Sequence, residues 1–269
     1  MKNARYKRVI GSWIENGVRA SLTLPLCLIF AALGYAADGP VSGVAAAALG
    51  SSPAIVVGFV GGFVHPDDVR HAEVQLARRL SATYGGHLHS AIFDNHHRKD
   101  AYRAIQRWLD TDADGDLSEA ERRASRIILY GHSWGAAAAL SLARDLQREN
   151  IPVLLTIQVD SISKIGQNDR VVPANVAEAV NFYQTRGWLH GRTEITAADP
   201  VHTEILGQFR FDYPKQPSEC HDYPWLTRHL FKGHTAIECD PNVWSQVGDL
   251  IDSTLSNGHK ESASEAALR

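Results

Sequence analysis

The sequence predicts an α/β fold with a mostly parallel central sheet and helices on both of its faces. From residue 53 onward, short β-branched apolar runs alternate with longer helix-like segments, which is typical of parallel strands joined by helices. The run that begins at residue 54 is apolar at consecutive positions, as a strand buried on both faces is. A chain of 269 residues that is 44% hydrophobic and 21% charged is long enough for one such domain.

The amino-terminal part of this domain contains the first two expected strands. Residues 54–59 form the first strand, which ends in a glycine-containing loop at 60–63. A polar helix with acidic residues near its start should follow. A second strand is expected over residues 87–93, and a second helix over 102–109 because apolar residues recur there at fourfold spacing.

The remaining elements continue the alternation as far as residue 256, where we expect the domain (53–256) to end. They are, in chain order, a strand at 126–130, a helix at 136–148, a strand at 153–159, a helix or strand at 174–182 and an amphipathic helix at 243–255. The polar residues 257–269 are expected to form a flexible tail.

The first 36 residues differ from the rest of the chain. Five basic residues and one acidic residue accompany an apolar run at 22–33, and small residues follow it, so we expect a signal peptide at 1–36 and a linker at 37–52. The run is shorter than the about 20 residues of a transmembrane helix. Export to the periplasm or the medium is therefore favoured, and the alternative is a membrane anchor formed by the uncleaved segment.

Removal of this segment would change the formal net charge from −3 to −7 and leave two cysteines, Cys220 and Cys239. An acidic chain is not expected to bind nucleic acid. In an oxidising compartment the two cysteines should form a disulfide, which would contribute on the order of 3 kcal/mol by closing a loop of about 20 residues. The alternative is two separate buried thiols.

The motif GHSWG at residues 131–135 lies where an expected strand meets an expected helix. A serine on such a tight turn exposes its hydroxyl above the sheet, and the flanking glycines let strand and helix approach each other. The motif predicts Ser133 as a nucleophile. Its oxyanion would be stabilised by the Trp134 amide and by one amide of the 60–63 loop, where Gly61 and Gly62 allow an N–H to turn inward.

A nucleophilic serine needs a base, and the base needs an acid that orients it. His234 is the favoured base because it lies shortly before the last expected helix, and His229 is its nearest rival. Asp160 is the favoured acid because it ends the strand after the helix that follows Ser133, which brings it to the same edge of the sheet. The alternative acids are Asp169 and, behind it, Asp199 and Asp212.

These features together resemble the α/β-hydrolase superfamily over residues 53–255. The resemblance implies a serine hydrolase in which Ser133, His234 and an aspartate form the triad, with a small-molecule or lipid ester as substrate and no organic cofactor. An acid at Asp160 resembles the pancreatic-lipase arrangement rather than the commoner one, in which the acid comes one strand later. An acyltransferase or thioesterase of this fold, or a non-catalytic binding module, is the alternative.

Residues 110–121 match the twelve-residue calcium loop of an EF-hand at its diagnostic positions, including the glycine, Gly115, at position 6. The expected ligands are Asp110, Asp112, Asp114, Asp116, Ser118 and Glu121. The loop resembles an EF-hand or dockerin-type loop, in which Ca²⁺ would be structural. The alternative is a solvated acidic loop whose following helix is capped by Ser118.

Aromatic residues are frequent in the segment between the candidate acid and His234. The candidates for the wall of a substrate pocket are Trp188, Phe209, Phe211, Tyr213, Tyr223, Trp225 and Phe231.

Overall fold

The computed structural model describes residues 54–267, and side chains as far as residue 257. The expected signal peptide (1–36) and linker (37–52) lie outside the described residues. No helix between residues 54 and 267 combines the length and the apolar character that crossing a bilayer requires.

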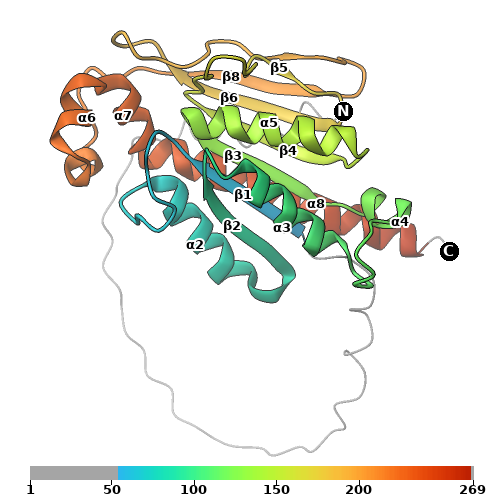
Figure 1. The fold of residues 1–269 in the computed structure, drawn as a ribbon. Coiled ribbons are helices and arrows are strands. Elements are labelled where there is room, and N and C mark those ends of the chain that lie inside the picture. The colour runs from blue at the N-terminus through green and yellow to red at the C-terminus, as the bar shows by residue number, and fades with distance from the viewer. Residues whose placement is uncertain (1–53, 268–269) are drawn as a thin grey trace, which may run out of the picture. The chain divides into compact units, whose positions relative to one another are not determined.

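The described residues form a six-stranded sheet in which all neighbouring strands are parallel (Figure 1). The strand order is β2-β1-β3-β4-β6-β8. These strands are β1 (Ala54–Val60), β2 (Leu88–Asp94), β3 (Ile127–His132), β4 (Val153–Val159), β6 (Val176–Gln184) and β8 (Glu204–Phe211). Two short strands, β5 (Val171–Val172) and β7 (Thr196–Ala197), pair separately.

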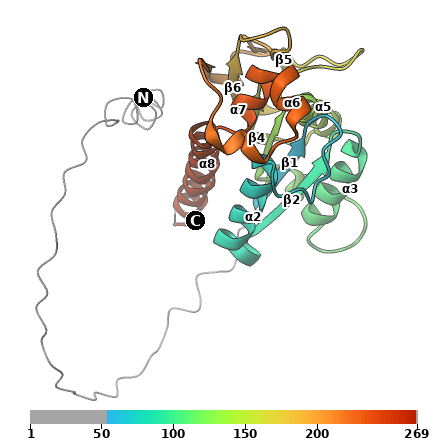
Figure 2. The ribbon, with the colours of Figure 1, turned by 90° about the vertical axis from the view of Figure 1, so that its left-hand side faces the viewer.

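Helices cover both faces of the sheet, as Figure 2 shows. The helices α3 (Arg98–Leu109) and α5 (Trp134–Arg148) pack on one face, and α2 (Ala72–Tyr84) and α8 (Pro241–Ala267) on the other. Consecutive residues of β3 show why, because side chains alternate between the faces of a strand. Leu129 belongs to the core beneath α3 and α5, whereas the Tyr130 hydroxyl donates to the Glu73 carbonyl of α2 at 3.0 Å.

The shorter helices lie in the connections. They are η1 (Gly85–His87), α4 (Glu119–Arg123), η2 (Ser218–Asp222), α6 (Trp225–Leu230) and α7 (Lys232–Glu238).

The fold class predicted from the sequence is confirmed, since the parallel sheet and its helices are those of an α/β-hydrolase fold. Three details differ. Residues 174–182, for which a helix and a strand were both open, contribute to strand β6, and β8 was not expected. The last helix, α8, continues to Ala267 through the segment expected to be a flexible tail. His234 lies shortly before the last helix, as expected, but within a short helix of its own, α7, which was not expected.

All the carboxyl ends of the parallel strands lie at one edge of the sheet, which is where open α/β sheets bind ligands. Residues that directly follow β1, β3 and β4 therefore meet there. They are Gly61, Ser133 and Asp160.

Candidate active site

Ser133 occupies a strained turn between β3 and α5. Its φ is 57° and its ψ is −127°, a conformation that non-glycine residues rarely adopt. The Ser133 amide donates to the Val159 carbonyl at the end of β4, at 3.0 Å, which fixes the turn against the neighbouring strand. A side chain at Gly135 would place its Cβ 2.3 Å from the Phe59 carbonyl oxygen, so only glycine lets α5 begin this close to β1.

Ser133, His234 and Asp160 form a continuous hydrogen-bonded chain. Oγ of Ser133 lies 2.8 Å from Nε2 of His234, and Nδ1 of His234 lies 2.7 Å from Oδ2 of Asp160. A carboxylate only accepts, so Nδ1 of His234 donates to Asp160 and its Nε2 is left to accept the proton of the Ser133 hydroxyl. The arrangement can transfer a proton from the serine to the histidine when the serine attacks an electrophile.

Asp160 is fully buried and is held by three further hydrogen bonds. Oδ2 accepts from Nε2 of Gln184 at 2.8 Å, and Oδ1 accepts from the amides of Gly191 and Gln184 at 2.8 and 3.3 Å. Burial raises the pKa of Asp160, but the bonds from His234, Gln184 and Gly191 outweigh it and lower the pKa below its ordinary value. Asp160 therefore remains ionised beside the histidine. Gln184 and Gly191 were not identified from the sequence, because only the fold brings them to this carboxylate.

The alternative residues have other partners. Asp169 is buried but accepts from Nε of Arg192 at 2.7 Å and from the Ser161 hydroxyl at 3.0 Å. The remaining candidates are bonded locally: Asp199 to His202, Asp212 to Arg210, and His229 to the Trp225 carbonyl.

The residues expected to stabilise an oxyanion lie next to Ser133. A Cβ on Gly61 would lie 2.9 Å from Cβ of Ser133, so the loop after β1 passes directly beside the serine. Gly62 has a φ of 49°, and its carbonyl accepts from the Asn95 side chain at 2.6 Å, which fixes the loop from outside. Trp134 begins α5, so its amide has no intrahelical acceptor.

Aromatic and basic side chains surround the entrance to the serine. Phe63, which is 89% exposed, contacts the Trp134 ring edge-on with centroids 5.6 Å apart. Nζ of Lys164 lies 4.8 Å from the centroid of the Trp134 ring and donates to the side chain of Asn95. Ser133 itself is only 6% exposed, so access to its hydroxyl is narrow.

Most of the aromatic residues proposed for a pocket wall pack elsewhere. Phe209 and Phe211 contact Phe182 in the sheet, the Tyr213 hydroxyl donates to Asp240, and Tyr223 is buried against His71. Trp188 and Trp225 are 73% and 63% exposed. Trp188 contacts Phe231, with ring centroids 5.4 Å apart.

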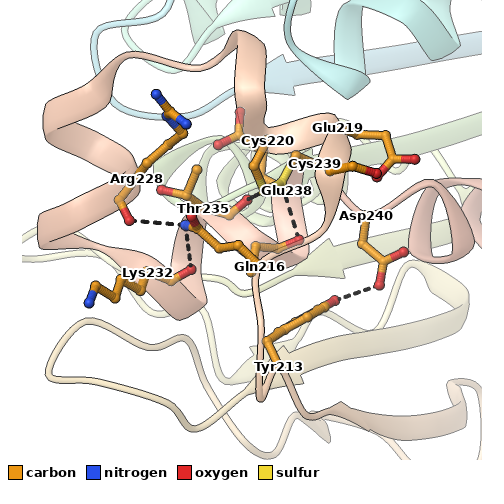
Figure 3. Close-up of a disulfide and its surroundings, with 12 residues drawn as sticks. Tyr213, Gln216, Glu219, Cys220, Arg228, Lys232, Thr235, Glu238, Cys239 and Asp240 are labelled. Atoms are coloured by element: carbon orange, nitrogen blue, oxygen red, sulfur yellow. Dashed lines mark hydrogen bonds between the residues drawn. A yellow bond between two sulfur atoms is a disulfide. The ribbon is translucent and has the colours of Figure 1, made fainter.

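A disulfide joins Cys220 to Cys239, whose Cα atoms are 5.2 Å apart (Figure 3). It connects η2 with the residue that follows α7, the helix that carries His234. Around it, the Gln216 side chain donates to the carbonyls of Arg228 and Lys232, and these bonds tie the same segment to α6 and α7 (Figure 3). The bridge and these bonds hold the candidate base in position.

The acidic loop 110–121 places three of the expected calcium ligands together. The carboxylates of Asp110, Asp112 and Asp114 offer oxygens within 4.8 Å of one another. The Gly115 amide, at a φ of 92°, donates to Oδ2 of Asp110 at 3.1 Å, and Oδ1 of Asp110 is buried without a hydrogen-bond partner in the described residues. Glu121 accepts hydrogen bonds from Thr111 and Ser118.

The acidic loop is also internally hydrogen-bonded. Ser118 caps α4 and forms a capping box with Glu121, and the amide of Asp116 donates to Oδ1 of Asp114 at 2.8 Å. The hydrogen bonds that Glu121 accepts from Ser118 and Thr111 lower its pKa to about 2. At Asp112 the amide of Asp114 lowers the pKa, but desolvation and the neighbouring carboxylates raise it further, so the pKa is raised overall.

A buried cluster that was not identified from the sequence lies behind the serine. It consists of His71, Glu73, His132 and Glu238, each less than a tenth exposed. Burial raises the pKa of Glu73 to about 8, with a further contribution from Glu238, and burial lowers the pKa of His132 to about 4. Only His132 belongs to a recognisable motif. His71 and Glu73 are only two residues apart, but Glu238 lies far from them in the sequence, and no pattern links it to them.

Comparisons with known proteins find similarity in solved structures only, since no protein-family model and no curated protein match the sequence. The structure described as "RedJ with PEG molecule bound in the active site" is 10% identical, with a TM-score of 0.38, over 74% of this chain and 89% of that one.

Two further similar structures are esterases. A thermostable esterase from Pseudomonas putida ECU1011 is 12% identical, with a TM-score of 0.40, over 76% of this chain and 74% of that one. A double mutant of the esterase rPPE is 11% identical, with a TM-score of 0.39, over 76% and 73% of the two chains. Similarity this low carries no information on the substrate of this chain.

Proposed function

We propose that this protein is a serine hydrolase that cleaves a small carboxylic ester through an acyl-enzyme. The observation that carries the proposal is the hydrogen-bonded chain from Ser133 through His234 to Asp160, at a strained strand-to-helix turn. In this role Ser133 is the nucleophile, His234 the base and Asp160 the acid that orients it.

The reaction would proceed in two steps. Oγ of Ser133 forms a bond to the carbonyl carbon while its proton passes to Nε2 of His234, and that proton then leaves with the alcohol as the ester bond breaks. A water molecule next loses a proton to Nε2 of His234 and attacks the acyl carbon. The bond from that carbon to Oγ then breaks, and His234 returns the proton to Oγ, which releases the carboxylic acid and restores Ser133. Asp160 stays ionised throughout and stabilises the protonated imidazole.

The negative oxygen of each tetrahedral intermediate needs preorganised donors. The amide of Trp134, at the positive end of the α5 dipole, is one proposed donor. The second is an amide of the loop that contains Gly61 and Gly62, which passes beside Ser133.

We further propose that the acyl group is short. Ser133 and His234 are 6% and 7% exposed, and cavities of about 810, 390 and 300 Å³ in the described residues are lined by neither of them. The leaving group would then lie outside, against the exposed ring of Phe63 and the half-buried ring of Trp134.

The experiment that tests the proposed reaction is hydrolysis of p-nitrophenyl acetate by the purified protein and by two serine variants. Ser133→Ala should lower kcat by a factor of at least about 10⁴, since it removes the nucleophile. Ser161→Ala is a matched control, because Ser161 is also buried and lies near Asp160 in the chain but bonds Asp169. Equal rates for wild type and Ser133→Ala would refute the proposal.

Two properties accompany the proposed activity. We propose export from the cytoplasm, which is supported by the bridge between Cys220 and Cys239, because structural disulfides persist in oxidising compartments.

We also propose that Asp110, Asp112 and Asp114 bind Ca²⁺, together with Asp116, Ser118 and Glu121, since Asp110 offers an unpartnered buried oxygen. Glu121 would exchange hydrogen bonds to Thr111 and Ser118 for the ion. The ion would brace the chain that leads into β3.

A further inference from the structure

We propose that His71, Glu73 and Glu238 form a binding site for one divalent transition-metal ion, Zn²⁺ by preference, behind the strained turn at Ser133. His132 contributes a fourth donor. The proposal is independent of the proposed hydrolysis and of the acidic loop 110–121, which is a separate segment.

The donor atoms are close enough for one ion to bind them. One ligand atom from each of His71, Glu73 and Glu238 lies within 4.8 Å of the others. Nδ1 of His132 lies 3.7 Å from Oε1 of Glu73 and 3.6 Å from Oε2 of Glu238. Ligand atoms around a tetrahedral Zn²⁺ are about 3.3 Å apart, given bonds of about 2.0–2.1 Å. Nδ1 of His132 and each carboxylate would need to approach by a few tenths of an ångström, and the ligand atoms of His71, Glu73 and Glu238, which lie within 4.8 Å of one another, would draw together around the ion. His71 would release its hydrogen bond to Glu238.

Glu73 provides a separate observation that points to a ligand. Its side chain is completely buried, and neither carboxylate oxygen accepts a hydrogen bond of ordinary geometry from the described residues. Burial raises the pKa of this carboxyl and outweighs the nearby backbone amides of Gly61 and of Glu73 itself, which lower it. The hydroxyl of Tyr223, which packs against the ring of His71, is likewise buried and unpartnered in the described part of the chain. Buried carboxylates are normally paired or coordinate a metal. His71 pairs with one of the two buried carboxylates, that of Glu238. The carboxylate of Glu73 has no such hydrogen bond in the described residues.

The chemistry of the donors selects the ion. Two imidazoles and two carboxylates form a mixed nitrogen and oxygen set, which suits Zn²⁺ and related divalent ions better than Ca²⁺, whose ligands are oxygens. The two ionised carboxylates would balance the charge of the dication, and the two imidazoles would bind as neutral ligands.

An outer carboxylate and a neighbouring cavity lie next to the site. Oδ2 of Asp68 lies 3.7 Å from Nε2 of His71, the ring nitrogen that the ion would leave free. Ligating histidines are usually oriented by such a carboxylate. A cavity of about 810 Å³ lies beside the cluster, and its lining includes Ala72, Tyr223 and Cys239, which adjoin the ligands.

The ion would join three elements that meet behind Ser133. His71 and Glu73 stand at the start of α2, His132 at the end of β3, and Glu238 at the end of α7, next to the bridged Cys239 (Figure 3). Its expected role is therefore structural, as a second clamp on α7 besides the disulfide.

The test uses the purified full-length protein, stripped with a chelator and dialysed, and measures Zn²⁺ uptake by isothermal titration and Tm by calorimetry. Wild type should bind one equivalent, and Tm should rise by on the order of 5 °C at a hundredfold excess over Kd. Glu73→Gln keeps the shape of the side chain but removes its charge, and its Kd should be at least about tenfold weaker. Glu149→Gln, the same change at an exposed residue, and Asp112→Asn, in the acidic loop, should bind as wild type does.

Spectroscopy of the wild type does not depend on the folding of any variant. Co²⁺ in place of Zn²⁺ should give the intense visible absorption of a four-coordinate site, which excess Zn²⁺ abolishes. The proposal is overturned by absence of uptake in the wild type, or by equal uptake in wild type and Glu73→Gln, which would indicate binding to exposed histidines. A Co²⁺ spectrum that Asp112→Asn removes would also overturn it.

Discussion

Asp160 and His234 are 74 residues apart in the sequence and are joined by a hydrogen bond of 2.7 Å in the fold. The bond forms because Asp160 directly follows β4, the neighbour of β3, whereas α7 carries His234 back over the same edge of the sheet. It distinguishes Asp160 from Asp169, which is equally buried but bonded to Arg192.

Asp160→Asn should lower kcat for p-nitrophenyl acetate by about 10³–10⁴-fold. An asparagine in its place does not hold His234 in the tautomer that accepts the serine proton. Asp169→Asn serves as the control and should change kcat less than tenfold, although the loss of its charged bond to Arg192 should lower Tm. A larger kcat loss for Asp169→Asn than for Asp160→Asn would assign the acid to Asp169.

Gln184→Leu should weaken catalysis through Asp160, because Nε2 of Gln184 donates to Oδ2 of that carboxylate at 2.8 Å. We expect a loss in kcat of roughly tenfold, with little change in KM. Asn181→Leu is a suitable control, since Asn181 is also buried in β6 but its side chain bonds Arg192 and Gln208. Equal losses in both variants would mean that Gln184 matters only for folding.

The dependence of stability on pH should report the ionised Asp160. Its pKa in the folded state lies below the ordinary value of 3.8, so the carboxylate contributes stability above that pH and loses it as the pH falls further. Gln184→Leu raises the folded pKa toward the unfolded one and should flatten this loss. The free energy of unfolding of the wild type and of Gln184→Leu, measured with denaturant from about pH 5 to about pH 2, shows this difference, since the range includes the ordinary carboxyl pKa.

Removal of the disulfide should destabilise the region around His234. Replacement of Cys220 and Cys239 by alanine together should lower the free energy of unfolding by about 2–4 kcal/mol, because the open chain gains conformational entropy when unfolded. Since the bridge adjoins α7, kcat should fall as well. An unchanged Tm on reduction of the wild type would contradict this.

Calcium should stabilise the protein through the acidic loop. Addition of Ca²⁺ after treatment with EGTA should raise Tm by a few degrees in the wild type and not in Asp112→Asn. Glu73→Gln should respond to Ca²⁺ as wild type does, which separates this loop from the buried cluster. An identical Tm with and without Ca²⁺ leaves Asp110–Glu121 a solvated loop, with α4 capped by Ser118.

The rate should fall as the acyl chain of the substrate lengthens. We expect kcat/KM for p-nitrophenyl esters to be highest for acetate or propionate and to fall at least about tenfold by octanoate, because Ser133 is only 6% exposed. A maximum at octanoate or longer would contradict the short acyl group and leave the catalytic assignment intact.

The sequence was informative where local patterns determine structure. Apolar β-branched runs identified β1 and β4, and the GHSWG motif identified the turn at Ser133, since its glycines are required by close backbone packing. It was less informative for β8, whose residues are only partly buried and whose position at the edge of the sheet gives it a weak apolar pattern. Gln184 and Glu73 carry no local signal, because their roles depend on contacts that only the tertiary fold creates.

The role of Ser133 as an activated nucleophile is tested most directly by covalent labelling of the purified protein with a fluorophosphonate, followed by mass spectrometry of its peptides. We expect one label per chain, on Ser133, which Ser133→Ala abolishes and His234→Ala slows by several orders of magnitude, while Ser161→Ala labels as wild type does. A protein that keeps its native Tm but takes no label, or takes it on another residue, would contradict the assignment of Ser133 as an activated nucleophile.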